Sequence, residues 1–213
     1  MPRPKEFDEA TVLEAAMRCF WYRGYKQTSM RDLTEKMGIS SMSVYNAFGD
    51  KRSLYRRALD YYLEHSVRDR IARLSRLPPS SAIRAFFDEI VERSVTDRRR
   101  RGCMLVNSAL EVAPYDPEFQ KLAANEMISI EGFFCRCIAE GQRDGTITSK
   151  LPAEELAKVL LSVLLGIRVL ARTRPQRIVL ESAARGALSG FDRRRSGHAQ
   201  SGAPGARPAE GGG

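Results

Sequence analysis

The chain has 213 residues, which is enough for one large domain or for a small module joined to a larger one. With 43% hydrophobic and 29% charged residues it has the composition of a soluble globular protein, and no apolar run approaches the roughly 18 residues of a membrane-spanning helix. The formal net charge of +9 favours polyanionic partners, because binding to phosphates releases their counterions.

The first residues and the cysteines indicate the compartment. The N-terminal segment is charged and has no apolar core, so we expect no signal peptide and a cytoplasmic location. The four cysteines are then expected to be reduced thiols. With only two histidines beside them, no spacing typical of a zinc site is present, so neither a metal nor another cofactor is expected.

Apolar residues recur at helical spacing nearly throughout, and strand signals are almost absent, which predicts an all-α fold. A short arm carries Arg3 and Lys5 beside two prolines and is expected to be flexible or extended. The predicted helices then cover residues 8–24, 29–37, 41–48, 50–76, 81–98, 103–112, 118–141, 152–172 and 175–190. From residue 192 on, Gly, Arg, Ala and Pro dominate, which predicts a disordered tail.

Local signals mark several of these boundaries. Asp8 is a good N-cap for the first helix, and Thr28 or Ser29 caps the second. A glycine-containing turn, residues 38–40, separates the second helix from the third. Two consecutive prolines within residues 77–80 end the long fourth helix.

The second and third predicted helices form a helix-turn-helix, whose second helix is able to enter the major groove of DNA. The side chains expected to face inward are aliphatic or aromatic: Leu33, Met37, Ile39, Val44 and Phe48. The outward or edge positions of the third helix are then Ser41, Met42, Ser43, Tyr45 and Asn46. Ser and Asn read base edges, Met and Tyr contact a thymine methyl, and a Tyr hydroxyl reaches phosphate. Thr28 and Lys51 stand at two helix N-termini, which favour phosphate. Packed short helices without a DNA role remain the alternative.

A more specific signal lies in the residues themselves. The stretch from Phe7 to Tyr62 resembles the DNA-binding domain of TetR-family repressors through Phe7-Asp8, Ala15-Ala16, Phe20-Trp21, Gly24-Tyr25, Thr28-Ser29, Asp32-Leu33, Met37-Gly38-Ile39-Ser40, Ser43-Val44-Tyr45, Phe48-Gly49-Asp50-Lys51 and Leu54. Two later segments, residues 102–111 and 166–172, look like parts of one branch of that family. The resemblance implies an all-helical homodimer that binds a near-palindromic operator and is released by a small molecule. It also implies DNA contacts by Thr28, Ser41, Met42, Ser43, Tyr45, Asn46 and Lys51, with Arg3 and Lys5 adding backbone or minor-groove contacts.

The helix predicted over residues 152–172 is apolar on more than one face, which indicates burial on two sides. One side would be its own domain and the other a partner subunit, in a four-helix bundle of the kind the resemblance implies. The predicted dimer residues on this helix and the next are Val159, Val163, Ile167, Leu170, Leu180, Ala184 and Leu188. An ordinary core helix is the alternative for each of them.

A ligand cavity is expected among the middle helices. Phe and Met suit an adaptable apolar pocket, and Asn or Glu orients a polar ligand. The predicted ligand-binding residues are Phe86, Phe87, Cys103, Asn107, Glu111, Met127, Ile130 and Phe134. Each of them is alternatively plain core or surface.

Cys103 follows four consecutive arginines and a glycine, at a predicted helix N-terminus. Helix dipole and cationic charge both lower a thiol pKa, which suits sensing of oxidants or electrophiles. A small buried hydrophobic residue is the alternative. Arg168, inside an apolar helix, needs a carboxylate, a carbonyl or a partner across the dimer.

No nucleophile–base pair, phosphate loop or metal cluster is visible, so we do not expect an enzyme. The sequence predicts a helix-turn-helix DNA-binding domain at residues 1–50, a larger ligand-binding and dimerisation domain at 51–191, and the tail at 192–213. The expected function is that of a transcriptional regulator, a repressor released from its operator by a small-molecule inducer. A ligand-independent architectural DNA-binding protein is the alternative.

Overall fold

The computed structural model describes residues 7–189 and 191, and this part of the chain contains helices and turns but no strand. The α-helices are α1 (Glu9–Arg23), α2 (Met30–Met37), α3 (Ser41–Phe48), α4 (Lys51–Leu63), α5 (Asp69–Leu74), α6 (Pro79–Thr96), α7 (Met104–Glu111), α8 (Pro117–Arg143), α9 (Ala153–Thr173) and α10 (Arg177–Leu188). The predicted all-α class is therefore confirmed. The predicted arm with Arg3 and Lys5, and the predicted tail, lie outside the described residues.

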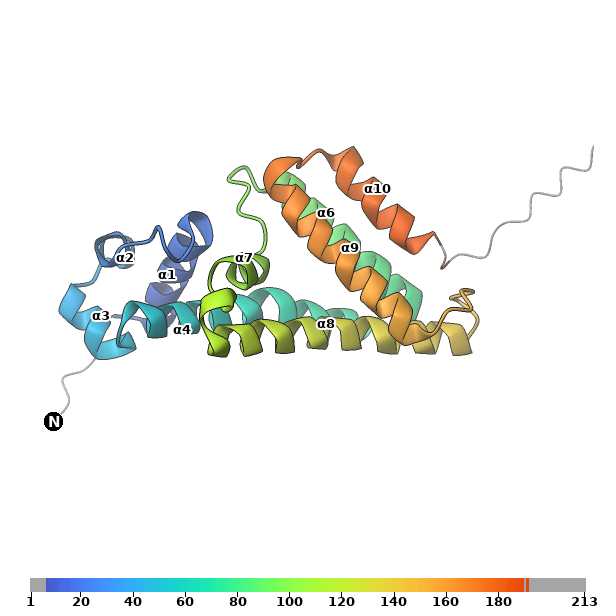
Figure 1. Ribbon diagram of the computed structural model, residues 1–213, viewed down its shortest axis with the longest axis horizontal. Coiled ribbons are helices and arrows are strands. Elements are labelled where there is room, and N and C mark those ends of the chain that lie inside the picture. The colour runs from blue at the N-terminus through green and yellow to red at the C-terminus, as the bar shows by residue number, and fades with distance from the viewer. Residues whose placement is uncertain (1–6, 190, 192–213) are drawn as a thin grey trace, which may run out of the picture.

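The molecule is elongated, with α1, α2 and α3 at one end and α6, α9 and α10 side by side at the other (Figure 1). We call α1–α3 the head and α5–α10 the body. Between them, α4 packs against α1 and also contacts α7, while the long α8 packs against α6 and α9. One hydrophobic core runs from Val12 to Phe191, so head and body share a continuous interior. The predicted division between residues 50 and 51 stays a prediction.

Side-chain caps explain where most of the head helices begin. Asp8, Ser40 and Asp50 each accept a hydrogen bond from a backbone N–H in the first turn of the helix that follows. Of the two predicted caps for α2, Ser29 is the one used, and it forms a capping box with Asp32. These contacts lie within three residues along the chain, which is why the sequence alone predicts them.

The predicted long helix over residues 50–76 was wrong in one respect, because a π-helical turn, Glu64–Arg68, separates α4 from α5. The inward residues Tyr62, Ser66, Arg70 and Leu74 follow one another at four-residue spacing. An α-helix has 3.6 residues per turn, so this spacing would drift around the helix unless a wider turn absorbed the difference. The π-helical turn keeps all four side chains buried.

The buried guanidinium of Arg70 is paired with a carboxylate. Arg70 is 4% exposed and donates to Glu89 at 3.0 Å and to the Ser66 carbonyl oxygen at 2.8 Å. Such partners offset the cost of removing a guanidinium from water. In the part of the chain that the structure describes, no helix is long and apolar enough to span a bilayer.

Candidate functional site

The helix-turn-helix is built around a glycine turn between α2 and α3. Gly38 has φ 68°, a left-handed conformation that costs glycine nothing but is strained for other residues. Leu33, Val44 and Phe48 are buried behind the turn, with Ile39 half-buried at its edge. The aliphatic side of the motif therefore holds α3 against the rest of the head.

The opposite side of α3 faces solvent. Met42 is 69% exposed and Tyr45 is 51% exposed, and Ser41 and Asn46 are exposed beside them. These four side chains lie on one face of the helix and are free to contact a partner. An α-helix fits the major groove, where amide and hydroxyl groups reach base edges and apolar groups reach the thymine methyl.

Ser43 lies at the edge of this face. It is half-buried, its backbone N–H donates to the Ser40 hydroxyl at 3.1 Å, and the two hydroxyl oxygens are 3.0 Å apart. Ser40 thus caps α3, while the Ser43 hydroxyl hydrogen-bonds with the Ser40 hydroxyl and retains a free lone pair for a further contact.

Thr28 does not fit its predicted role, because its side chain is only 1% exposed. The hydroxyl donates to the Gly24 carbonyl oxygen at 2.6 Å and so closes the turn between α1 and α2. A direct side-chain contact with DNA is excluded in this conformation. Ser29, its exposed neighbour, holds the N-terminus of α2 instead.

Lys51 lies at the start of α4 but is half-buried. Its ammonium group lies over the Tyr25 ring, 4.5 Å from the centroid, and burial lowers the pKa of Lys51 below its ordinary value. The adjoining Asp50 carboxylate accepts from the Ser53 N–H at 2.7 Å. A phosphate that approaches the start of α4 would therefore meet the Lys51 ammonium group, which lies on the Tyr25 ring, next to the N-terminus that Asp50 caps.

Glu111 was predicted in the ligand cavity, and the structure corrects this. Its carboxylate accepts from the backbone N–H groups of Tyr25 at 3.0 Å and Lys26 at 2.7 Å, in the loop that joins α1 to α2. Asn107 is also engaged elsewhere, since its side-chain amide bonds to the Arg101 carbonyl and to Arg172. The contacts of Glu111 are not visible in the local sequence, because its partners are 85 residues or more away along the chain.

The contacts of Glu111 belong to a wider joint between head and body. Arg52 on α4 donates to Asp116 at 2.6 Å and to Glu118 at 2.6 Å, at the start of α8. The Tyr55 hydroxyl and the Ser108 hydroxyl are 2.6 Å apart. The end of α7 and the start of α8 thus hold both α4 and the loop after α1.

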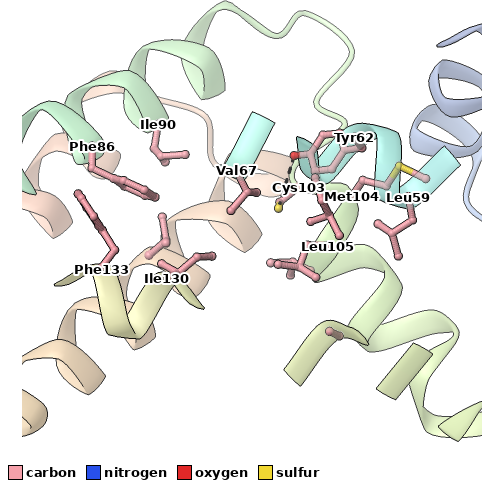
Figure 2. Packing of buried hydrophobic residues seen from close by; sticks show 14 of the residues in the cluster. Leu59, Tyr62, Val67, Phe86, Ile90, Cys103, Met104, Leu105, Ile130 and Phe133 are labelled. Atoms are coloured by element: carbon pink, nitrogen blue, oxygen red, sulfur yellow. Dashed lines mark hydrogen bonds between the residues drawn. The ribbon is translucent and has the colours of Figure 1, made fainter. Parts of the chain in front are cut away.

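The interior cavity is small. About 30 Å³ is open among residues of α4, α6, α7, α8 and α9, which is room for about one water molecule. Of the predicted ligand residues, Phe86, Cys103 and Ile130 line it (Figure 2). Phe87 and Phe134 instead stack on each other, with ring centroids 5.8 Å apart, and Met127 is half-buried outside the cavity lining.

Cys103 is buried at the N-terminus of α7, where its sulfur accepts a hydrogen bond from the Tyr62 hydroxyl at 3.6 Å (Figure 2). Burial by itself raises the pKa of the thiol, but the nearby Arg168 guanidinium and the amide groups of α7 outweigh it. The pKa of Cys103 therefore lies below its ordinary value. Burial raises the pKa of Tyr62 to about 12, so its hydroxyl stays protonated and donates.

Arg168 has the hydrogen-bond partners that its burial was predicted to require, but none of them is a carboxylate. It donates to the Ser94 hydroxyl at 2.8 Å and to the Gly102 carbonyl oxygen at 2.5 Å. Among the residues described, no group of three His, Cys, Asp or Glu side chains is placed to hold a metal ion.

The predicted dimer residues divide into two groups. Ile167, Leu180, Ala184 and Leu188 are buried within the single chain, because α10 turns its apolar face toward α9 and α6. Within the single chain they offer little surface to a partner subunit, and their role in a dimer stays a prediction. Val159 is 50% exposed, and Val163 and Leu170 are half-buried.

Three large apolar side chains of these two helices are nevertheless exposed. Val169 is 46% exposed and Ile178 is 65% exposed, and both lie on α9 or α10 together with Val159. A Cβ added at Gly166 would meet nothing within 4 Å. We call Val159, Val169 and Ile178 the α9–α10 surface.

Comparison with known proteins agrees with this geometry. Residues 12–58 match bacterial regulatory proteins of the tetR family, and residues 79–187 match the tetracyclin repressor-like C-terminal domain. The uncharacterized HTH-type transcriptional regulator YezE of Bacillus subtilis is 34% identical over 153 residues, which cover 70% of this chain and 78% of YezE. The HTH-type transcriptional repressor ComR of Escherichia coli is 27% identical over 172 residues, 80% of this chain and 82% of ComR.

A solved structure is similar over most of its length. It contains a cysteine-substituted form of the TetR family transcriptional regulator CifR, bound to a 26-base-pair double-strand operator. It matches with a TM-score of 0.79 and 34% identity, covering 89% of this chain and 99% of that one. The family and these relatives are transcriptional regulators, a non-enzymatic class. This chain is a member of the TetR family of DNA-binding transcriptional regulators.

Proposed function

We propose that the protein represses transcription as a homodimer on a near-palindromic operator and that a small molecule releases it. The observation that carries the proposal is the two-sided α3, with Val44 and Phe48 buried and Met42, Tyr45 and Asn46 exposed. The outward residues Ser41 and Ser43 would share the base-reading role with these three. The relatives support the direction of control, since ComR is described as a repressor and the CifR structure holds operator DNA.

Dimerisation is expected from geometry as well as from the family. Two recognition helices read successive major grooves only when they are roughly 34–36 Å apart, which one head cannot achieve. The α9–α10 surface is apolar, solvent-exposed and at the end of the molecule away from α3 (Figure 1). A symmetric contact there would hold two heads at a defined separation.

Release by an inducer would act through the joint between head and body. The 30 Å³ cavity is too small for an organic molecule, so an inducer that binds there has to move its walls. A shift of α7 would displace Glu111 and with it the loop after α1. The effect on DNA binding is limited to the difference in inducer affinity between the two conformations.

The test is selection of bound duplexes from a random DNA pool with the purified protein. The proposal expects an inverted repeat whose half-sites are separated by about one helical turn or a multiple of it. Recovery of duplexes without a shared sequence would overturn it and would favour the alternative, an architectural DNA-binding protein. The recovered repeat also identifies genomic targets, whose products point to the inducer.

A second mode of control is favoured by the surroundings of Cys103. The Tyr62 hydroxyl and the Arg168 guanidinium both stabilise negative charge on its sulfur, at a helix N-terminus. We infer that the Cys103 thiolate adds to the electrophilic carbon of an activated carbon–carbon double bond: a carbon–sulfur bond forms, the π bond breaks, and the neighbouring carbon takes a proton from water. The added group would have to fit beside the small cavity and would push on α7.

N-ethylmaleimide tests this inference, with the Cys103→Ser variant identifying the labelled site. Because the pKa of Cys103 is lowered, its thiolate fraction at neutral pH exceeds that of a free thiol. The rate of alkylation should therefore reach half its maximum at a lower pH than for glutathione. The half-buried Cys135, whose pKa burial raises, serves as the internal control. Labelling of Cys103 no faster than of Cys135 would remove the inference.

A further inference from the structure

A cleft of about 710 Å³ lies apart from the recognition helix and adjoins the interior cavity, with which it shares Tyr62, Ser66, Arg93 and Arg168. Its walls come from the head and from the body: Trp21 on α1, Tyr62 on α4, Arg93 on α6, the connection between α6 and α7, and Arg168 on α9. In Figure 1 that connection, residues 97–103, rises beside α1. The volume is that of a site for a small organic ligand.

The cleft is strongly basic. Six arginines line it against two carboxylates, those of Glu14 and Asp97. Both carboxylates are already paired, Glu14 with Arg18 and Asp97 with Arg101. Arg93 and Arg98, by contrast, have no carboxylate within 4 Å among the residues that the structure describes, and Arg93 donates only to the Ser66 hydroxyl at 3.4 Å. Guanidinium groups without anionic partners attract a free anion.

Unsatisfied hydrogen-bond donors point to the same place. In residues 7–189 and 191, two buried side-chain atoms lack a partner, Trp21 Nε1 and Arg168 Nε, and both residues line this cleft. Both groups are donors and neither is able to accept. Arg168 is 7% exposed, so an unpaired donor there is costly and calls for an acceptor.

The backbone of the connection is held in a defined shape. The Asp97 carboxylate accepts from the N–H groups of Arg99 at 3.2 Å and Arg101 at 2.8 Å. Arg100 has φ 50° and Gly102 has φ 71°, and the Gly102 carbonyl accepts from Arg168. A strained turn that brings like charges together persists only when its surroundings fix it, and such turns occur at ligand sites.

From these observations we propose that the cleft binds a small organic anion, a carboxylate or a phosphate ester. Its charged group lies among Arg93, Arg98 and Arg168. A small shift of the Trp21 side chain, whose Nε1 is closed to solvent in the structure, lets an acceptor atom of the ligand complete the hydrogen bonding of that residue. The hollow shape and the aromatic walls suit a small molecule better than a macromolecule, which would need a flat or convex basic face. A bound anion links α1 to α9 and so holds the head against the body.

Trp21 is the only tryptophan of the chain, so its fluorescence reports on the cleft directly. The probes are benzoate, phenyl phosphate and the neutral benzyl alcohol, titrated into the full-length protein without DNA. The proposal expects saturable changes in fluorescence with benzoate or phenyl phosphate and none with benzyl alcohol. The two anions distinguish a carboxylate from a phosphate ligand, and either one supports the proposal. If neither anion binds, the proposal for the cleft fails, but the proposed binding to operator DNA is not affected, because the titration contains no DNA.

Paired variants locate the binding site. Replacing Arg93→Gln together with Arg98→Gln should weaken anion binding by about tenfold, because two charge-assisted contacts are lost. Arg136→Gln, on the exposed face of α8, removes a positive charge elsewhere and should leave the affinity unchanged. Calorimetry of the Trp21→Phe variant, which keeps an aromatic ring but loses the N–H donor, should show weaker binding. Equal affinities in all variants, or no saturable response to either anion, would overturn the proposal.

Discussion

Asn46 and Lys51 stand for two kinds of contact that a DNA-binding head makes. Asn46 is exposed on α3, and in the proposed complex its side-chain amide would pair with an adenine edge. Lys51 is at the start of α4, where its ammonium group would contact phosphate without reading sequence. The two residues should therefore fail in different ways when they are replaced.

We predict that Asn46→Ala costs about 1–3 kcal/mol on the preferred operator and relaxes the preference at one base pair. Lys51→Gln should weaken binding to every duplex by a similar factor and should reduce the slope of log affinity against log salt by about one. Fluorescence anisotropy with matched and mutated operators, over a series of salt concentrations, measures both effects. Equal losses on all sequences from both variants would contradict the two roles.

Thr28 shows why single residues are difficult to assign from sequence. A hydroxyl beside a helix start is compatible with capping, with phosphate binding and with closing the preceding turn. The 2.6 Å hydrogen bond to the Gly24 carbonyl selects the third of these. That choice depends on how the chain turns between α1 and α2, which the local sequence does not specify.

At the scale of elements, local chemistry explains most helix boundaries. Serine and aspartate caps, glycines with positive φ, and prolines act within a few residues of the helix end that they define. The exception is the π-helical turn between α4 and α5. This turn keeps side chains at four-residue spacing buried. Those side chains are buried only because the body helices pack around the segment, which the local sequence does not show.

Two glycines give a matched test of backbone strain. Gly38→Ala should destabilise the fold by about 1 kcal/mol, because φ 68° is unfavourable for alanine while its Cβ would meet nothing within 4 Å. Gly132→Ala in the middle of α8 should stabilise it by about 0.5–1 kcal/mol, since its nearest neighbour is the flexible end of Arg136 at 3.4 Å. Urea unfolding measures both, and changes of the same sign would contradict the assignment of Gly38 to the left-handed turn.

At the scale of the whole molecule, head and body are joined by polar contacts over a shared apolar core. Glu111 joins the end of α7 to the loop after α1, and Arg52 joins the start of α8 to α4. The basic cleft crosses the same boundary on another side, between α1 and α9. The head therefore adjoins the body at the polar joint and at the cleft, and a small molecule bound as proposed at either place would change how the two parts are held.

Substitutions at two isoleucines with the same exposed fraction test whether the α9–α10 surface forms the dimer interface. Ile178 on α10 and Ile128 on α8 are both 65% exposed, but only Ile178 belongs to the α9–α10 surface. Ile178→Glu should raise the dimer dissociation constant by at least about tenfold, because it places a charge in an apolar contact. Ile128→Glu should leave it unchanged. Sedimentation velocity measures the association, and dissociation by Ile128→Glu instead would move the interface to α8.

The sequence by itself determined the helical class, the caps, the turn before α3 and the two-sided character of α3. These follow from interactions between residues a few positions apart, and from the helical period, both of which are written locally in the chain. Only the tertiary structure decided which apolar residues of α9 and α10 are buried within the chain. An apolar pattern predicts that a residue is buried, but it does not say which neighbouring helix or subunit covers it. It also decided that Glu111 accepts hydrogen bonds from the loop after α1 and that residues as distant as Trp21 and Arg168 line one basic cleft. Such contacts exist only after the helices have packed.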